Sequence, residues 1–333
     1  MDVSLIICTY NRHESLRQTL RTVCELIIPD GLNWELLVVD NNSNDATRQV
    51  CESFKDRLPL RYLFEPKQGV SRARNLAISR ANAPLLFFTD DDVNLDKEWF
   101  CSLWDAAQWH PEIGIFAGRI LPLWVGTPPP WLTSRTQSML RLVCSCLDLG
   151  DGERIVTRIG HGPWGASMVL RKSILNSELR FNERLGRCGR RTSHLRGGET
   201  ELIHRLYDSG HKGLYVGRAI VHHRNPPSQG TERYVFRYYR GAGKTEIRLQ
   251  EIPVDGRCWL GAPRYFWFKV LKHALQYGLW RWTRPPEVWL RAEIQMAKNW
   301  GRILELRRIG KNSHERSGLR PLHASQTGAQ LGS

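Results

Sequence analysis

A short apolar segment, residues 84–89 (PLLFFT), runs directly into three consecutive aspartates, Asp90, Asp91 and Asp92. An unbroken apolar run of this length predicts a strand that is buried on both faces, because a strand with one solvent face alternates apolar and polar residues. Side chains along an extended segment alternate in direction, so Asp90 and Asp92 are expected on one side. The chain therefore needs a sheet covered by helices, with carboxylates at one strand end.

Two earlier apolar segments also end in polar residues. Residues 3–8 lead into Thr9, and residues 35–39 lead into Asp40, with a helix-like stretch between them. This order predicts a strand–helix–strand unit and, with its continuation, a largely parallel sheet with helices on both faces. Ligands bind beyond the carboxyl ends of such strands, so the polar residues are expected at one edge. In this half the expected strands are 3–8, 35–39, 60–64 and 84–89, and the expected helices are 14–27 and 71–80.

The second half of the chain predicts a mixed pattern. Glycine and arginine dominate residues 180–198, which indicates a mobile basic loop. From residue 261 onward the apolar spacing becomes helical, with a break at Pro285 and Pro286. Residues 311–333 are polar enough to predict a disordered tail. The expected strands here are 113–121, 167–170 and 213–223, and one helix is expected at 199–209.

Three polar clusters suit metal, nucleoside and phosphate chemistry, although each has a plainer explanation. The carboxylates of Asp90 and Asp92 are of the kind that Mg²⁺ and Mn²⁺ prefer, but acidic residues also end strands and cap helices. Asp40 and the polar residues after it suit a base or a ribose, but the same residues form an Asx turn. Arg72 and Arg74 open a helix, where guanidinium groups bind phosphate or remain as exposed charges.

Four short motifs follow one another in a regular order and spacing. They are CTYNR at residues 8–12, VVDNNSND at 38–45, GVSRARN at 69–75 and FFTDDD at 87–92. In these motifs the chain resembles the inverting family 2 glycosyltransferases, over roughly residues 1–245. Four separate motifs that agree in order make this resemblance more specific than any one of them alone.

The resemblance implies an α/β fold of the GT-A type, in which a Rossmann-like half and an acceptor half share one mixed, mostly parallel sheet flanked by helices. It also implies a nucleotide diphosphate sugar as donor and a divalent cation, Mn²⁺ or Mg²⁺, as cofactor. Asp92 and Asp90 would bind the cation with His223, although a histidine at a strand end is often structural. The residues implied to bind the nucleotide sugar are Thr9, Tyr10, Asn11, Asp40, Arg72, Arg74, Asp90 and Asp91.

Residues 197–202 (GGETEL) resemble the family's helix start that carries the general base. The match places Glu199 at the base position and Gly198 where the family usually has glutamate, which is a departure. A glutamate also suits the N-terminus of a helix without any catalytic role. The family's strand beneath the donor sugar and the acceptor resembles the segment that contains Gly165, Ala166 and Ser167, where core packing is the alternative.

These parts imply a single displacement. The base would remove a proton from an acceptor hydroxyl, whose oxygen attacks the anomeric carbon with inversion while the nucleotide diphosphate leaves. The acceptor is expected to be a glycan or a lipid-linked glycan, and the absence of the QxxRW motif of processive synthases favours a non-processive enzyme. The expected domains are a glycosyltransferase domain at 1–245, with a nucleotide-sugar half at 1–122 and an acceptor half at 123–245, and a helical extension at 246–310.

The C-terminal part is basic and rich in tryptophan. The whole chain has a formal net charge of +15, and residues 257–308 carry eleven Lys or Arg against three Glu, with six of the thirteen Trp. Phe268, Leu271, Leu275 and Leu279 recur at helical spacing, which predicts a helix in the plane of an anionic membrane surface. The alternative is a helical lobe that packs its aromatic residues on the catalytic domain.

The start of the chain has no signal-peptide pattern, and no apolar run is long enough to span a bilayer. We therefore expect a cytoplasmic enzyme that is peripheral on the cytoplasmic face of the membrane.

Two other functions remain open from the residues alone. A sugar-nucleotide nucleotidyltransferase would share the metal aspartates, but it normally has a glycine-rich phosphate loop after the first strand, where residues 9–12 contain no glycine. A basic nucleic-acid-binding protein fits the net charge. Against it, a phosphate backbone would be repelled by Asp90, Asp91, Asp92 and Glu199, so no nucleic-acid partner is expected.

Overall fold

The computed structural model describes residues 1–156, 165–183, 185, 198–249, 252, 254 and 256–311. The chain forms two compact units, Met1–Thr231 and Glu232–Ser333. The predicted boundary at residue 245 falls inside helix α7 (Glu232–Arg248), which belongs to the second unit. Most of the predicted basic loop at 180–198 and the predicted tail from residue 312 on lie outside the described residues.

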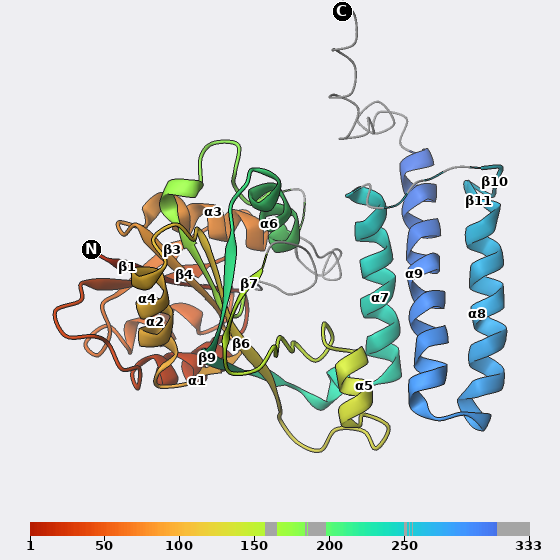
Figure 1. The fold of residues 1–333 in the computed structure, drawn as a ribbon, viewed down its shortest axis with the longest axis horizontal. Helices are drawn as coiled ribbons and strands as arrows, with labels where there is room; N and C mark the ends of the chain where they lie inside the picture. Colours follow the sequence, from red (N-terminus) through yellow and green to blue (C-terminus); the bar gives the residue numbers. More distant parts are fainter. Residues whose placement is uncertain are drawn as a thin grey trace, which may run out of the picture. The chain divides into compact units, whose positions relative to one another are not determined.

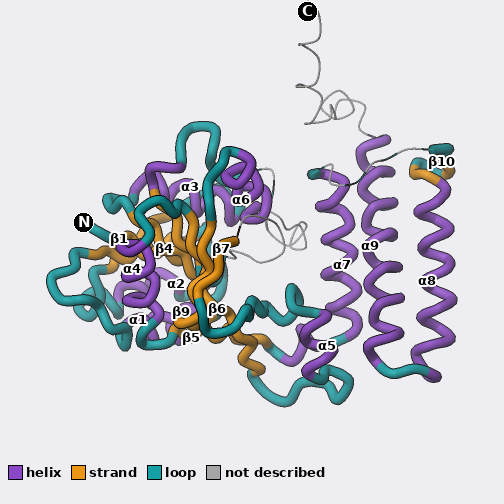
Figure 2. Tube along the Cα trace, in the orientation of Figure 1, coloured by secondary structure: helices purple, strands orange, loops and turns teal. Residues whose placement is uncertain are grey.

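The first unit is an α/β domain in which helices surround one sheet (Figure 1 and Figure 2). Its strands are β1 (Val3–Thr9), β2 (Trp34–Asp40), β3 (Leu60–Phe64), β4 (Leu85–Asp90), β5 (Val93–Leu95), β6 (Ile115–Trp124), β7 (Glu153–Val156), β8 (Met168–Arg171) and β9 (Gly213–Asn225). Its α-helices are α1 (His13–Val23), α2 (Thr47–Glu52), α3 (Val70–Arg80), α4 (Trp99–Trp109), α5 (Ser134–Met139) and α6 (Gly198–Asp208), and two short 3₁₀ turns are η1 (Lys172–Ile174) and η2 (Pro227–Gly230).

The sheet is mixed and has the strand order β3-β2-β1-β4-β8-β6-β9-β5, with β7 paired to β9. Strands β1 to β4 pair with one another in parallel, as predicted, whereas β8 is antiparallel to both β4 and β6. The register places Thr9 beside Asp40 and Cys8 beside Asp90. The polar ends of β1, β2 and β4 therefore meet at one edge of the sheet.

Helices cover both faces of this sheet. In β1, Leu5 and Ile7 belong to the core formed with α1, α2 and α4, whereas Ile6 belongs to the core formed with α3 and α6. Strands β2 and β4 divide their apolar residues in the same way, because side chains alternate between the two faces of a strand. The unbroken apolar runs seen in the sequence are thus strands buried on both faces.

Helices α1 and α4 differ from the sequence expectations. Helix α1 ends at Val23 instead of Ile27, because the Ile27 amide donates its hydrogen bond to the Lys97 carbonyl (2.9 Å) and so leaves the helical path. Helix α4 was not expected, although Trp99 and Phe100 are fully buried against the sheet.

The second unit contains α7, α8 (Arg264–Thr283) and α9 (Pro286–Lys311), with a small hairpin of β10 (Cys258–Trp259) and β11 (Ala262–Pro263). Helix α9 packs against both α7 and α8. Gly301 lies against the carbonyl of Arg240, where a side chain has no room, so the backbones of α7 and α9 approach closely. The predicted break is confirmed, since α9 begins at Pro286.

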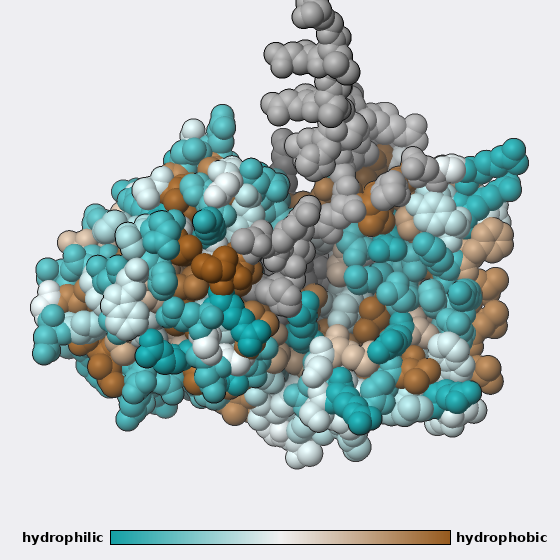
Figure 3. All heavy atoms as spheres, in the orientation of Figure 1, coloured by the Kyte–Doolittle hydropathy of each residue, from teal (hydrophilic) through white to brown (hydrophobic). Residues whose placement is uncertain are grey.

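Among the helices that the structure describes, none has the length and apolar character needed to cross a bilayer. Large apolar side chains are nevertheless exposed on the second unit. They gather along the outer edge of α8, at the right of Figure 3.

Candidate active site

The three aspartates lie where β4 ends. Asp90 is the last residue of β4, and Asp91 and Asp92 form a tight turn into β5. We call these three residues the aspartate turn. The turn, and not the alternation of an extended strand, brings Asp92 back beside Asp90 and directs Asp91 elsewhere. Ligand atoms of Asp90, Asp92 and His223 all lie within 4.8 Å of one another, which makes these three residues a candidate metal site.

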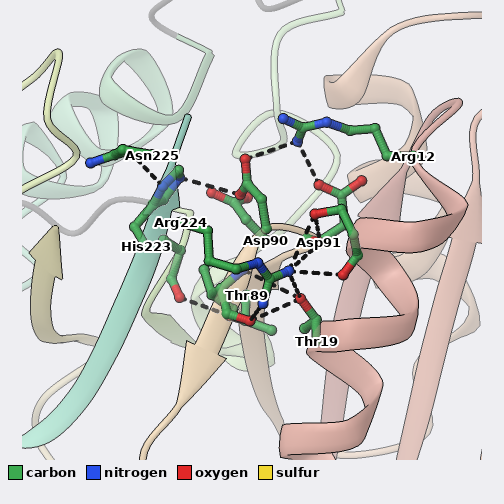
Figure 4. Close-up of polar contacts among 12 residues, drawn as sticks. Arg12, Thr19, Thr89, Asp90, Asp91, His223, Arg224 and Asn225 are labelled. Carbon is green, nitrogen blue, oxygen red and sulfur yellow. Dashed lines mark hydrogen bonds and ion pairs between the residues drawn. The ribbon is translucent and has the colours of Figure 1, made fainter. Parts of the chain in front are cut away.

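Strand pairing brings His223 to the aspartate turn. Strand β9 is antiparallel to β5, with His223 opposite Val93. The His223 Nε2 atom lies 3.2 Å from Asp92 Oδ1, and its Nδ1 atom lies 3.1 Å from Asn225 Oδ1, which fixes the orientation of the ring. Figure 4 shows His223 and Arg12 approaching the aspartates from opposite sides.

The electrostatics of these residues fit a divalent cation. Burial and the adjacent Asp92 carboxylate raise the pKa of Asp90 to about 6. The two carboxylates are ligands that suit Mn²⁺ or Mg²⁺, and the oriented imidazole would supply a nitrogen ligand. A cation at this position would offset the repulsion that raises the Asp90 pKa.

Asp91 points away from the candidate metal site. Its Oδ2 accepts a hydrogen bond from the Thr9 hydroxyl (2.6 Å), and its Oδ1 accepts one from Arg12 Nη1 (2.7 Å). The same Arg12 nitrogen lies 2.9 Å from Asp92 Oδ2, so the Arg12 guanidinium bridges the carboxylates of Asp91 and Asp92. Their charges raise the pKa of Arg12. Asp91 thus helps to hold the turn, and the donor-binding role expected for Thr9 and Asp91 stays a prediction.

Arg224 joins the backbone of the aspartate turn to helix α1. This arginine is buried, and its Nη2 atom donates to the Asp91 carbonyl (3.3 Å), the Ser15 carbonyl (2.8 Å) and the Thr19 hydroxyl (2.9 Å). Sequence reasoning did not select Arg12 or Arg224 as site residues. The available signals were the arginine that closes the CTYNR motif and the basic residue that follows His223.

Arg74 connects the aspartate turn with Glu199. Its Nη2 atom lies 2.5 Å from Glu199 Oε1 and 3.6 Å from Asp90 Oδ1. The Arg74 side chain is almost fully buried, with its guanidinium over the Phe181 ring, whereas 29% of the Glu199 side chain is exposed. The buried Arg74 guanidinium therefore positions the partly exposed Glu199 carboxylate, which lies in the first turn of α6.

Gly165 packs directly against this pair. A Cβ atom at this position would meet Arg74 Nη2 and Glu199 Oε1, so a larger residue would displace the ends of these two side chains. Ala166 and Ser167 are buried behind it, where the Ala166 carbonyl accepts from Thr89 and the Ser167 hydroxyl accepts from the indole of Trp99 (2.8 Å).

Asp40, the last residue of β2, and Asn11, which follows β1, are also predicted to bind the nucleotide sugar and lie at the same sheet edge. Asp40 is buried and accepts hydrogen bonds from the Ser43 amide (2.8 Å) and the Tyr62 hydroxyl (2.7 Å). Asn11 has a left-handed backbone (φ 51°) and accepts from the Asn44 amide (2.8 Å), which ties together the loops after β1 and β2.

Two further predicted residues lie outside this network. Tyr10 is exposed, and Arg72 forms an ion pair with Glu183 (2.8 Å) at the start of α3.

Comparisons with known proteins identify the family of the chain. The profile of glycosyl transferase family 2 matches residues 4–179, which is more than half of the chain. The succinoglycan biosynthesis protein ExoM of Rhizobium meliloti is 26% identical over 254 residues, which are 75% of this chain and 75% of that protein. A validoxylamine A glucosyltransferase of Streptomyces hygroscopicus subsp. limoneus is 31% identical over 171 residues, which are 50% of this chain and 35% of that enzyme.

A solved structure shares the fold. The mannosyltransferase PcManGT from Pyrobaculum calidifontis, in complex with GDP-Man and Mn²⁺, superposes with a TM-score of 0.53 at 16% identity, covering 94% of this chain and 75% of that chain. The predicted α/β fold of the GT-A type, with a mixed sheet and C-terminal helices, is thereby confirmed.

Proposed function

The chain belongs to glycosyl transferase family 2, and we propose that it is an inverting, metal-dependent enzyme that adds single sugars to an acceptor hydroxyl. The observation that carries this proposal is the pair of contacts made by Arg74, which links the candidate metal site to Glu199. Membership of this family of transferases sets aside the nucleotidyltransferase and the nucleic-acid-binding protein that remained open from the residues alone.

Asp90, Asp92 and His223 would hold the cation. A bound divalent cation would neutralise charge on the donor's diphosphate and so favour departure of the nucleotide. The Mn²⁺ and GDP-Man of the Pyrobaculum mannosyltransferase support such a pairing for a chain of the same fold. The nucleoside would lie along the edge formed by Thr9, Asn11 and Asp40, beside the exposed ring of Tyr10. Arg72 would exchange its partner Glu183 for a phosphate of the donor.

Glu199 is the proposed general base. Its carboxylate takes the proton of the acceptor hydroxyl, and the acceptor oxygen forms a bond to the anomeric carbon of the sugar. The bond from that carbon to the nucleotide diphosphate breaks on the opposite face, and the diphosphate leaves with the electron pair. Attack and departure on opposite faces invert the configuration. Arg74 positions the Glu199 carboxylate throughout, since its guanidinium is buried and already contacts Oε1. Gly165 would lie where donor sugar and acceptor meet, with Ala166 and Ser167 packed behind it.

The acceptor is proposed to be a glycan or a lipid-linked glycan. The similarity to the succinoglycan biosynthesis protein ExoM, which spans three quarters of both chains, supports polysaccharide biosynthesis as the setting. A lipid-linked acceptor would place a non-processive enzyme at the cytoplasmic face of a membrane, and the basic residues between 257 and 308 are consistent with an anionic surface.

A thermal-shift panel tests the proposal. The purified chain is heated with UDP, GDP, TDP or CDP, each with and without Mn²⁺, because a ligand that binds only the native state raises the melting temperature. We expect one nucleotide to stabilise the protein in a Mn²⁺-dependent manner and the effect to disappear in Asp92→Ala. Stabilisation by none of the nucleotides under either condition would contradict the proposal.

A further inference from the structure

Helix α8 carries large apolar side chains that no other part of the described chain covers. Phe268, Leu271, Leu275, Leu279 and Trp282 are 69%, 58%, 68%, 65% and 84% exposed. Steps of three and four residues separate them, so they lie on one face of the helix. We call these five residues the α8 stripe. At the helical rise it is about 20 Å long, and a continuous exposed apolar surface of this size marks an interaction site.

The opposite face of α8 is already occupied. Phe266 is 1% exposed and forms a core with Ile303 of α9, and the Tyr277 ring lies against Trp289 of α9. The packing of the three helices therefore does not involve the α8 stripe. Residues on the other face of α8 make the contacts that hold this helix in place.

The charges around the stripe all have the same sign. Helix α8 contains Arg264, Lys269, Lys272 and Arg281, and its sequence includes no Asp or Glu. Arg264, Lys269 and Lys272 are exposed, whereas Arg281 forms an ion pair with Glu232 of α7 (2.7 Å). The stripe thus combines an apolar face with a basic border, which is complementary to the acyl region and the phosphate head groups of an anionic bilayer.

We propose that α8 docks in the plane of an anionic membrane, with the α8 stripe at the level of the acyl boundary and the three exposed cations on lipid phosphates. Self-association through the same face would bring the uncompensated positive charges of two copies together, which disfavours a second chain as the occupant. Insertion across the bilayer is excluded for α8 by its composition.

The structure narrows the membrane-binding segment expected from the sequence. Within residues 257–308, the apolar residues Trp289, Leu290 and Ile303 of α9 are buried inside the unit. At the N-terminal end of α8, the hairpin exposes Trp259 and Leu260, and the Trp267 indole donates to the Trp259 carbonyl (2.9 Å). Docking is thus assigned to α8 and this hairpin tip. The inference rests on the proposed function in one respect only. The purpose of docking would be to bring the enzyme to a lipid-linked acceptor.

Vesicle flotation of the full chain tests the docking. Vesicles of equal parts phosphatidylglycerol and phosphatidylcholine are compared with vesicles of phosphatidylcholine alone. We expect the chain to float with the anionic vesicles, and the combined variant Leu271→Ser, Leu275→Ser, Leu279→Ser to lose at least about tenfold in vesicle affinity. The combined variant Lys269→Gln, Lys272→Gln should lose a smaller factor and become less sensitive to salt.

A matched control removes exposed apolar residues from the first unit. Ile27, Trp109 and Ile155 are 51%, 65% and 56% exposed, so serine at these three positions changes surface apolarity without touching α8. This variant is expected to float like the wild type. All of the substituted side chains are exposed, and an unchanged melting temperature identifies variants that fold normally.

Three results would overturn the docking. They are failure of the wild-type chain to float with anionic vesicles, equal flotation of the leucine variant, and a wild-type dimer in light scattering that the leucine variant converts to monomer. Nucleotide binding reports on the proposed function separately. A chain that floats but binds no nucleotide supports docking and contradicts the glycosyltransferase proposal, and the reverse result contradicts docking alone.

Discussion

Both units of the molecule bury acidic groups, and the two clusters differ in what they can do. In the first unit, Asp90 and Asp92 converge with His223 at a sheet edge where about a third of the Asp90 side chain remains exposed. In the second unit, Glu293 of α9 is 3% exposed. Its burial, and to a lesser extent the negative charge of Glu232, raises its pKa to about 8.

The two clusters differ in how close their ligand atoms lie to one another and in how accessible these atoms are to solvent. Glu232 is held by the Tyr277 hydroxyl and the Arg281 guanidinium (both 2.7 Å), which are contacts between helices of one unit. Among the residues that the structure describes, only Asp90, Asp92 and His223 group their ligand atoms tightly enough to hold an ion. A raised carboxyl pKa therefore marks burial in both units, whereas ligand atoms that meet at an accessible edge distinguish the candidate active site.

The largest effect is expected for Asp92→Ala. Loss of this carboxylate removes one ligand of the candidate metal site, and transferase activity should fall on the order of 10³-fold. The measurement is release of nucleotide diphosphate from the donor at saturating Mn²⁺. Glu293→Gln is the matched control and should leave that rate unchanged. Comparable activity losses in the two variants would erase the distinction between the clusters.

Glu199→Gln should lower kcat on the order of 10²-fold while leaving nucleotide affinity unchanged, because an amide cannot accept the proton of the acceptor. Steady-state kinetics together with nucleotide titration separate the two quantities. Glu201 offers a control on the same helix, since its carboxylate pairs with Arg205 (2.8 Å). If Glu201→Gln impaired kcat more than Glu199→Gln, the assignment of the base would be wrong.

The buried Glu293 should make folding stability depend on pH. Its pKa is raised from an unfolded value near 4.3 to about 8, so the folded state favours the protonated form. The associated stability is complete below the unfolded pKa and is lost as pH rises to about 8, with a total change of a few kcal/mol. Denaturant unfolding between pH 5 and pH 8 measures this slope. In Glu293→Gln the slope should flatten, and an unchanged slope would show that another group is responsible.

The smallest effect is expected for Tyr277→Phe. This change removes the hydrogen bond to Glu232 Oε2 and should cost about 1 kcal/mol of unfolding free energy, since the partner carboxylate is partly solvated and keeps Arg281. Tyr10→Phe is the control, because Tyr10 is exposed and should contribute nothing measurable to stability. Activity loss in Tyr277→Phe without loss of stability would give the helical unit a catalytic role that we do not expect.

The sequence predicted the parts of the fold whose patterns are local. Strands β1, β2 and β4 contain apolar runs, and parallel pairing brings their polar ends to one edge, so Asp40 and Asp90 were correctly placed near Thr9. The exposure of Leu271 and Leu275 also agrees with the helical spacing.

Other features depend on contacts between distant segments. A turn directs Asp91 to Thr9 and Arg12, and Arg224 reaches Ser15 across more than 200 positions of sequence. The ion pair of Arg74 with Glu199 joins α3 to α6. Such contacts leave no periodic signal in the chain, which is why Arg12 and Arg224 were not selected and why the pairing of Arg74 with Glu199 was not predicted. The nucleotide-binding role expected for Arg74 stays a prediction.

Electron paramagnetic resonance of Mn²⁺ tests the central claim most directly, because free Mn²⁺ gives a sharp signal that broadens when the ion is bound. The chain is titrated with Mn²⁺ in the presence of the nucleotide diphosphate that stabilises it. The account predicts one bound Mn²⁺ per chain in the wild type and in Glu293→Gln, and none in Asp92→Ala. If Asp92→Ala bound Mn²⁺ as the wild type does, that result would contradict the assignment of Asp90, Asp92 and His223 as the metal site.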